Sequence, residues 1–155
     1  MTIDTAVVQE RLRLIRELLD DLSDIGEVTA SRLRRERITK HAVERIVTQL
    51  VDLSVAVNSH LAVALLSEAP ATYRESFSAA ARAGAISEEL GAQLAPSAGL
   101  RNILTHEYAA IDVRLVAASI PQMDTGYRQY VSSVARFLAT LESTREPSPV
   151  DDAPS

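Results

Sequence analysis

Hydrophobic residues recur at three- and four-residue steps along most of the chain, which is the spacing of one face of an α-helix. The first such stretch covers residues 4–25, with Asp4 as a candidate N-cap and Gly26 as the stop. A longer pattern over residues 39–67 is apolar on several sides, as expected of a central helix or of one that faces a second copy. These two stretches predict two long helices in the first half of the chain.

Proline and glycine divide the second half of the chain. Thr72 followed by Glu75 is a capping-box pattern, and Gly84 suits the end of the helix that it opens. The next helix is expected over residues 87–95, and a break is expected at residues 96–99, which contain a proline and a glycine.

Helical periodicity returns over residues 100–120, and Pro121 is suited to the first turn of a last helix. The segment 144–155 is rich in proline and charge, so we expect a disordered tail. The sequence therefore predicts an all-α fold, an antiparallel bundle of about five helices, with one domain over residues 1–143.

Composition narrows the functional classes. The chain has 155 residues, enough for one domain, and aromatic residues make up only 4%. The absence of cysteine excludes disulfide scaffolds, thiolate metal sites and cysteine nucleophiles. The first residues lack the basic and then apolar order of a secretory signal, and no run approaches about 18 uncharged apolar residues. We expect a cytoplasmic protein that does not contact a membrane.

A local basic segment stands against a net charge of −5. That net charge disfavours strong non-specific binding of nucleic acid by the whole molecule. Between residues 32 and 45 the cations outnumber Glu36 and Glu44, and they are Arg32, Arg34, Arg35, Arg37, Lys40 and Arg45. The segment is either a solvated helix face or a patch that attracts phosphate. In the second case Arg32, Arg34, Arg35, Arg37 and Lys40 are the candidate RNA-binding residues.

The three histidines, His41, His60 and His106, are too far apart in sequence to show a metal-binding spacing. No G-x-S-x-G motif is present to support a hydrolase of the nucleophile-elbow type. We therefore expect neither a metal nor a cofactor.

Residues 100–112, LRNILTHEYAAID, carry the polar groups best suited to chemistry. On a helix with about 100° per residue, the apolar side chains of this segment gather on one side. The opposite face carries Arg101, Asn102, Thr105, His106 and Tyr108. Arg101 and His106 lie at the two edges of that face and are expected to flank a groove without touching.

Histidine can move protons near neutral pH, and arginine offers a planar fork that matches phosphate oxygens. RNA suits this pair because its own 2′-hydroxyl can act as the nucleophile. One base must remove the proton of that hydroxyl and one acid must protonate the leaving 5′-oxygen. A single His106 cannot easily serve both ends, whereas a symmetric dimer would place two copies across one cleft.

An Arg and a His five residues apart are a weak signal, but a Tyr two residues later makes the combination more specific. The sequence R-N-x-L-x-H-x-Y at residues 101–108 resembles the R-x4–6-H motif of HEPN-domain ribonucleases. It is most similar to the R-x4-H-x-Y form of HepT-like toxins, with the following Ile111-Asp112. Residues 41–61 and 72–87 also resemble segments of that family, so the likeness covers roughly residues 5–140.

This resemblance implies an all-helical bundle that forms a homodimer with the motif at the dimer cleft. It implies a toxin that cleaves RNA without a metal and whose partner is a small nucleotidyltransferase antitoxin. Carried over residue by residue, Arg101 and His106 would be catalytic, Asn102 would support them, and the antitoxin would modify Tyr108. Relatives often carry more acidic residues on the second helix, where Asp52 fits one position and Ala56 replaces another.

Two other hypotheses remain open. The same helical dimer could be a non-catalytic subunit that binds a nucleotidyltransferase or its substrate. The chain could also be a plain helical scaffold, which would leave the coincidence of Arg101, His106 and Tyr108 to chance.

Overall fold

The computed structural model describes residues 2–106 and 111–145, and these residues form six α-helices without a β-strand. The helices are α1 (Thr5–Ile25), α2 (Ala30–Arg35), α3 (Arg37–Leu66), α4 (Tyr73–Arg82), α5 (Glu88–His106) and α6 (Val113–Arg145). The prediction of an all-α fold is confirmed, with six helices in place of about five.

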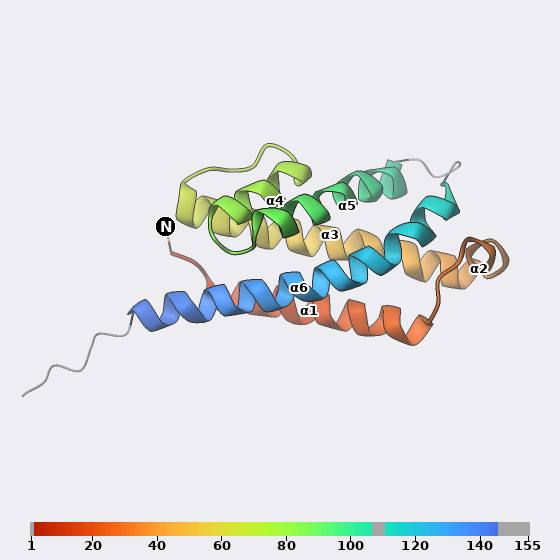
Figure 1. Ribbon diagram of the computed structural model, residues 1–155, viewed down its shortest axis with the longest axis horizontal. Helices are drawn as coiled ribbons and strands as arrows, with labels where there is room; N and C mark the ends of the chain where they lie inside the picture. Colours follow the sequence, from red (N-terminus) through yellow and green to blue (C-terminus); the bar gives the residue numbers. More distant parts are fainter. Residues whose placement is uncertain (1, 107–110, 146–155) are drawn as a thin grey trace, which may run out of the picture.

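The four long helices run along the long axis of the molecule, and successive long helices reverse direction (Figure 1). The central helix α3 contacts α1, α2, α4 and α5, and α6 packs against α1 and α5. The short helix α2 lies at the same end of the long axis as the end of α5 and the start of α6 (Figure 1). The buried side chains of all these helices form one hydrophobic core.

Helix α1 follows from its sequence pattern. The Asp4 side chain accepts a hydrogen bond from the backbone N–H of Val7 at 3.2 Å, which caps the first turn. Gly26 ends the helix with a φ of +82°, a conformation that residues with a side chain rarely adopt. The buried face repeats at helical spacing and consists of Val8, Leu12, Ile15, Leu19 and Leu22.

Helix α3 is buried on several sides, as its apolar pattern predicts. By length and composition alone it is also long and apolar enough to cross a membrane. It is covered by four other helices here, and the core helix of a water-soluble bundle meets the same criteria.

The basic segment before α3 is more ordered than a solvated loop. Thr29 caps a short helix, α2, by accepting a hydrogen bond from the backbone N–H of Arg32 at 3.1 Å. Leu33 anchors this helix in the core with 1% of its surface exposed. One buried leucine thus converts the charged segment into an additional helix.

The breaks predicted at the two prolines are wrong. Helix α5 runs through Pro96 and Gly99, and α6 runs through Pro121. A proline inside a helix costs about 3 kcal/mol, but buried neighbours on both sides of each proline hold the helix in the core. For Pro96 these neighbours include Leu94 and Ala98.

Helix α5 is described as far as His106, residues 107–110 lie outside the described residues, and α6 begins at Val113. The Asp112 side chain accepts a hydrogen bond from the backbone N–H of Arg114 at 3.0 Å. The Arg114 side chain and backbone N–H groups lower the pKa of Asp112. At the other end α6 includes Thr144 and Arg145, and the rest of the predicted tail, residues 146–155, lies outside the described residues.

Two fully buried tyrosines of α6, Tyr127 and Tyr130, meet edge to face with ring centroids 6.1 Å apart. Burial raises the pKa of Tyr127 to about 12, although hydrogen bonds to Ser54 and Ser97 partly oppose the shift. Burial also raises the pKa of Tyr130 well above its usual range. Both hydroxyls therefore remain neutral hydrogen-bonding groups at physiological pH.

Because these two tyrosines resist ionisation when folded, we expect the protein to lose stability at alkaline pH. An unfolded tyrosine ionises near pH 10, whereas folded Tyr127 resists ionisation to about pH 12. The free energy of unfolding is therefore unaffected by this group below pH 10 and falls as the pH rises above 10. At pH 12 the loss from Tyr127 alone is about 2 kcal/mol. Urea unfolding at pH 9, 10 and 11 would measure it, and Tyr127→Phe should reduce the dependence on pH. Ionisation of both buried tyrosines with unchanged helical content would contradict this expectation.

Candidate active site

Arg101, in the second half of α5, is held by residues from α3, α4 and α5. Its Nε–H donates to Oδ1 of Asp52 on α3 at 2.8 Å, which is also an ion pair. Its Nη1 donates to the hydroxyl of Thr105 at 3.4 Å. Its guanidinium carbon lies 4.9 Å from the ring centroid of Tyr73 on α4, within the range of a cation–π interaction. Three helices therefore fix this one side chain.

The Arg101 side chain is 19% exposed, while that of Asp52 is 40% exposed. A guanidinium has five N–H donors, and protein acceptors among the described residues take only the Nε–H and one on Nη1. The remaining donors suit a phosphate group, for which the planar fork is well matched. Arg101 is thus positioned on its buried side and retains donors for a ligand.

His106 is the last residue of α5, and both it and Asn102 are exposed. No hydrogen bond joins the His106 ring to another side chain in the part of the chain that the structure describes. Five residues of helix separate it from Arg101 by about 7.5 Å along the axis and about 140° around it. Leu100 and Leu104 of the same turns are buried in the core.

Asn102 and Thr105 lie between Arg101 and His106 on α5. The Thr105 hydroxyl donates to the carbonyl oxygens of Arg101 at 3.1 Å and of Asn102 at 3.2 Å, and it accepts from Arg101. Asn102 makes no side-chain hydrogen bond with other described residues, so its amide is open to a ligand. Tyr108, the predicted modification site, lies outside the described residues.

The predicted RNA-binding patch divides into two groups. Arg32 serves the fold, because it pairs with Glu36 at 3.1 Å and donates to the Ile25 and Glu27 carbonyl oxygens. Lys40 pairs with Glu44 at 3.6 Å.

The second group consists of Arg34, Arg35 and Arg37, which are exposed and form no ion pair within residues 2–106 and 111–145. Ile38, which follows Arg37 in the sequence, is 80% exposed. We call these three arginines the α2–α3 patch. The patch lies at the same end of the bundle as the end of α5 that carries His106 (Figure 1).

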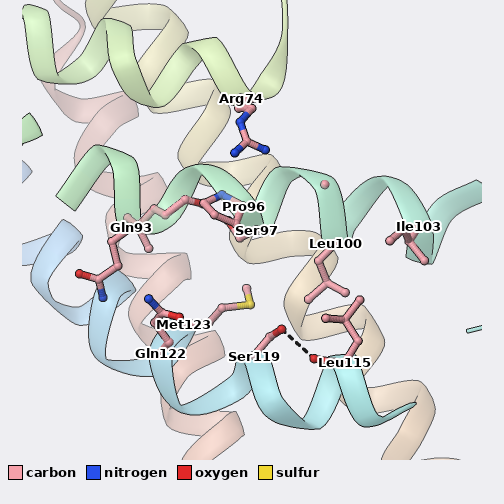
Figure 2. Close-up of a pocket in the computed structure, with 12 residues that line it drawn as sticks. Arg74, Gln93, Pro96, Ser97, Leu100, Ile103, Leu115, Ser119, Gln122 and Met123 are labelled. Carbon is pink, nitrogen blue, oxygen red and sulfur yellow. Dashed lines mark hydrogen bonds between the residues drawn. The ribbon is translucent and has the colours of Figure 1, made fainter. Parts of the chain in front are cut away.

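A cavity of about 290 Å³ lies between α5 and α6, with Arg74 of α4 at its edge (Figure 2). Its walls are mainly apolar and include Leu100, Ile103, Leu115 and Met123. Among the described motif residues, Arg101, Asn102, Thr105 and His106 do not line it. The cavity therefore does not coincide with the candidate active site.

A second depression of about 370 Å³ lies between α1 and α3. Asp52 lines it together with Arg45, Gln49 and Leu53 of α3. The partner of Arg101 is thus reachable from an open groove. Across the described ranges, no three His, Asp or Glu side chains converge in a way that could hold a metal ion.

The family model described as "Ribonuclease HepT-like" matches residues 9–134. The chain belongs to the HepT-like ribonuclease family. The chain is also 29% identical over 144 residues to a curated tRNA nuclease HepT from Aphanizomenon flos-aquae, strain 2012/KM1/D3. That match covers 93% of this chain and 98% of the relative. The family resemblance drawn from the motif is confirmed.

Solved structures share the fold of this HepT-like chain at 16% sequence identity. One is a tri-AMPylated HEPN toxin of Shewanella oneidensis in complex with an MNT antitoxin, with a TM-score of 0.75. That match covers 84% of this chain and 97% of the toxin. Another is the cytosolic protein YutE of Bacillus subtilis, with a TM-score of 0.76, covering 94% of this chain and 96% of that chain.

Sequence reasoning missed Tyr73 as a neighbour of Arg101. The two residues are far apart in sequence, and no motif or spacing connects an aromatic residue at the start of α4 with the middle of α5. The family resemblance assigns Asp52 to an acidic position of the second helix. Its ion pair with Arg101 places it beside the motif.

Proposed function

We propose that this protein is the toxin of a toxin–antitoxin pair and acts in the cytoplasm as a metal-independent endoribonuclease. The observation that carries the proposal is the Arg101 guanidinium, which Asp52 and Tyr73 hold on α5 five residues before the exposed His106. Membership of the HepT-like family, a tRNA nuclease relative and a toxin–antitoxin complex of the same fold support it.

The reaction uses the RNA 2′-hydroxyl as nucleophile. The 2′-oxygen attacks the adjacent phosphorus, a base takes its proton, and the bond from phosphorus to the 5′-oxygen breaks. The leaving oxygen takes a proton from an acid, which leaves a 2′,3′-cyclic phosphate and a 5′-hydroxyl. His106 exchanges these protons, and Arg101 donates N–H groups to the phosphate oxygens as charge builds on them. Asn102 supports the bound RNA through its free amide.

A homodimer supplies the second proton-transfer group. One imidazole cannot act at both the 2′- and 5′-oxygens at the same instant, because these oxygens lie on opposite sides of the phosphorus. Two copies related by a two-fold axis would present one His106 to each side of a shared cleft. The exposed position of His106 at the end of α5 leaves it free to face a second subunit.

The proposed antitoxin is a small nucleotidyltransferase that modifies Tyr108. The complex of the Shewanella toxin supports this, since that toxin is AMPylated and bound to an MNT antitoxin. Tyr108 is two residues beyond His106 in sequence, so each added nucleotide would bring negative charge near the proton-transfer group.

The α2–α3 patch supplies local attraction for RNA on a chain with net charge −5. Arg34, Arg35 and Arg37 carry the interaction, because Arg32 and Lys40 are already paired within the fold. Their place at the His106 end of the bundle would guide RNA toward the motif (Figure 1).

Substitutions in the motif should abolish cleavage of a transfer RNA in the presence of EDTA. His106→Ala should lower the rate at least about 100-fold because the proton-transfer group is lost. Arg101→Lys should lower it severely, because an ammonium lacks the planar fork. His41→Ala, which changes an exposed histidine of α3, is the matched control and should retain the wild-type rate. A wild-type rate for His106→Ala would exclude it as the acid or base. A wild type that cleaves without EDTA but not with EDTA would contradict metal independence.

Before that assay, the intact mass decides whether the purified toxin is already modified. Co-expression with a nucleotidyltransferase encoded beside it should raise the mass by whole nucleotides and suppress cleavage. Tyr108→Phe should cleave RNA at the unmodified rate and gain no mass, because it lacks the acceptor hydroxyl. A mass increase in Tyr108→Phe would place the modification elsewhere. An unmodified wild type that never cleaves would favour the non-catalytic binding subunit.

Removing the α2–α3 patch should weaken RNA binding without changing the chemistry. In the triple variant Arg34→Gln, Arg35→Gln and Arg37→Gln, the plot of log K for RNA binding against log salt concentration should become less steep. The change should correspond to the loss of about 2 to 3 phosphate contacts. The control changes the same number of exposed arginines elsewhere, with Arg13→Gln, Arg16→Gln and Arg136→Gln. Equal salt slopes in both variants would show that only net charge matters.

A further inference from the structure

Apart from the two tyrosines, the buried polar side chains of the described residues belong to one hydrogen-bond network. These side chains are Ser54, Asn58, Ser76 and Ser97. They join the hydroxyls of Tyr127 and Tyr130, and the two ends of the network lie beside Arg101. Such groups are costly to bury unless all are satisfied, so their collection at one place is a specific feature of this core.

The first branch joins α5, α6 and α3 through Tyr127. Its hydroxyl lies 2.7 Å from the Ser97 hydroxyl and 3.5 Å from the Ser54 hydroxyl. Ser97 is one helical turn before Arg101 on α5, and Ser54 is two residues after Asp52 on α3. The tyrosine therefore links α5 and α3, the two helices that the Arg101–Asp52 ion pair also joins.

The second branch joins α6, α3 and α4 through Tyr130. Its hydroxyl donates to Oδ1 of Asn58 at 2.6 Å, and Nδ2 of Asn58 donates to the Ser76 hydroxyl at 3.2 Å. Ser76 in turn donates to the backbone carbonyl of Tyr73 at 2.7 Å. This branch ends at the residue whose ring lies against the Arg101 guanidinium.

Apolar surfaces alone tolerate small shifts of one helix along another, because one aliphatic contact replaces another of similar energy. A buried hydroxyl is directional, so a shift that separates it from its partner leaves a polar group unsatisfied. Buried polar groups are best attested as devices that fix register. A fixed register of α5 against α3 and α4 is what the three-sided hold on Arg101 requires.

We propose that Tyr127 and Tyr130 are positioning residues that set the Arg101 guanidinium against Asp52 and Tyr73 from beneath the site. The positioning itself follows from the network, and its effect on RNA cleavage rests on the proposed function. The two parts can therefore be tested separately.

Hydrogen exchange of the Arg101 Nε–H measures the position of the guanidinium without any need for activity. NMR can assign this proton by its absence in Arg101→Lys. Tyr127→Phe should speed its exchange at least about tenfold relative to the core amides, because the hydrogen bond to Asp52 loosens. Leu138→Ala, a buried change on α6 that lines the groove toward α1, should lower stability but leave this relative exchange unchanged.

Unchanged exchange in Tyr127→Phe would overturn the proposal, as would an equal acceleration in Leu138→Ala, which would reflect general loosening. Ser97→Ala removes the partner hydroxyl from α5 and leaves the tyrosine in place. It should act in the same direction as Tyr127→Phe, and it decides the question if the tyrosine variant does not fold.

The rate assay then separates this proposal from the proposed function. If the wild type cleaves RNA, Tyr127→Phe should lower kcat about tenfold with little change in KM, and should add nothing in an Arg101→Lys background. A further tenfold loss in that background would show that Tyr127 does not act through Arg101. If the unmodified wild type, verified by its intact mass, does not cleave, the proposed function fails, and the exchange measurement still decides whether the network positions Arg101.

Discussion

A helix that is apolar on several sides is stable in water only when other helices cover it, and α3 imposes this constraint on the whole structure. Helices α1, α2, α4 and α5 pack along it, and α6 packs against α1, α2 and α5 and reaches α3 through Tyr127 and Tyr130. Packing around α3 explains why the short basic segment forms the helix α2 and why α5 and α6 continue through their prolines. Each of these segments gains more from burial in this core than its local sequence loses.

The same cover decides where the candidate chemistry can lie. The polar side of α5 remains outside the core, and Arg101 lies where α5 crosses α3 and α4. Arg101 is thus held by contacts with two other helices, whereas His106 occupies the last position of its helix. On the proposed function, phosphate recognition would use the packed Arg101, and proton transfer would use the exposed end of α5.

Local signals in the sequence were sufficient for features that depend on local geometry. The Asp4 cap, the stop at Gly26 and the capping residue Thr72 all occur as predicted, because each depends on neighbouring backbone groups. The continuity of α5 through Pro96 could not be predicted locally, since it depends on tertiary burial. The partners of Arg101 were beyond reach for a related reason, since Tyr73 and Asp52 meet it only when three helices pack. For the same reason, charge counting could not separate the paired Arg32 from the free arginines of the patch.

The separation of Arg101 from His106 bears on how such a toxin can be silenced. Arg101 is held by Asp52 and Tyr73, so a change at this residue would also disturb the contact between α3 and α5. The segment just beyond His106 carries a tyrosine hydroxyl, that of Tyr108. On the proposed function, nucleotides added there would place phosphates where the RNA backbone must approach, and like charges would repel it. Modification at Tyr108 would thus block the substrate while it leaves the packed Arg101 and its network intact, which makes the silenced toxin a folded protein.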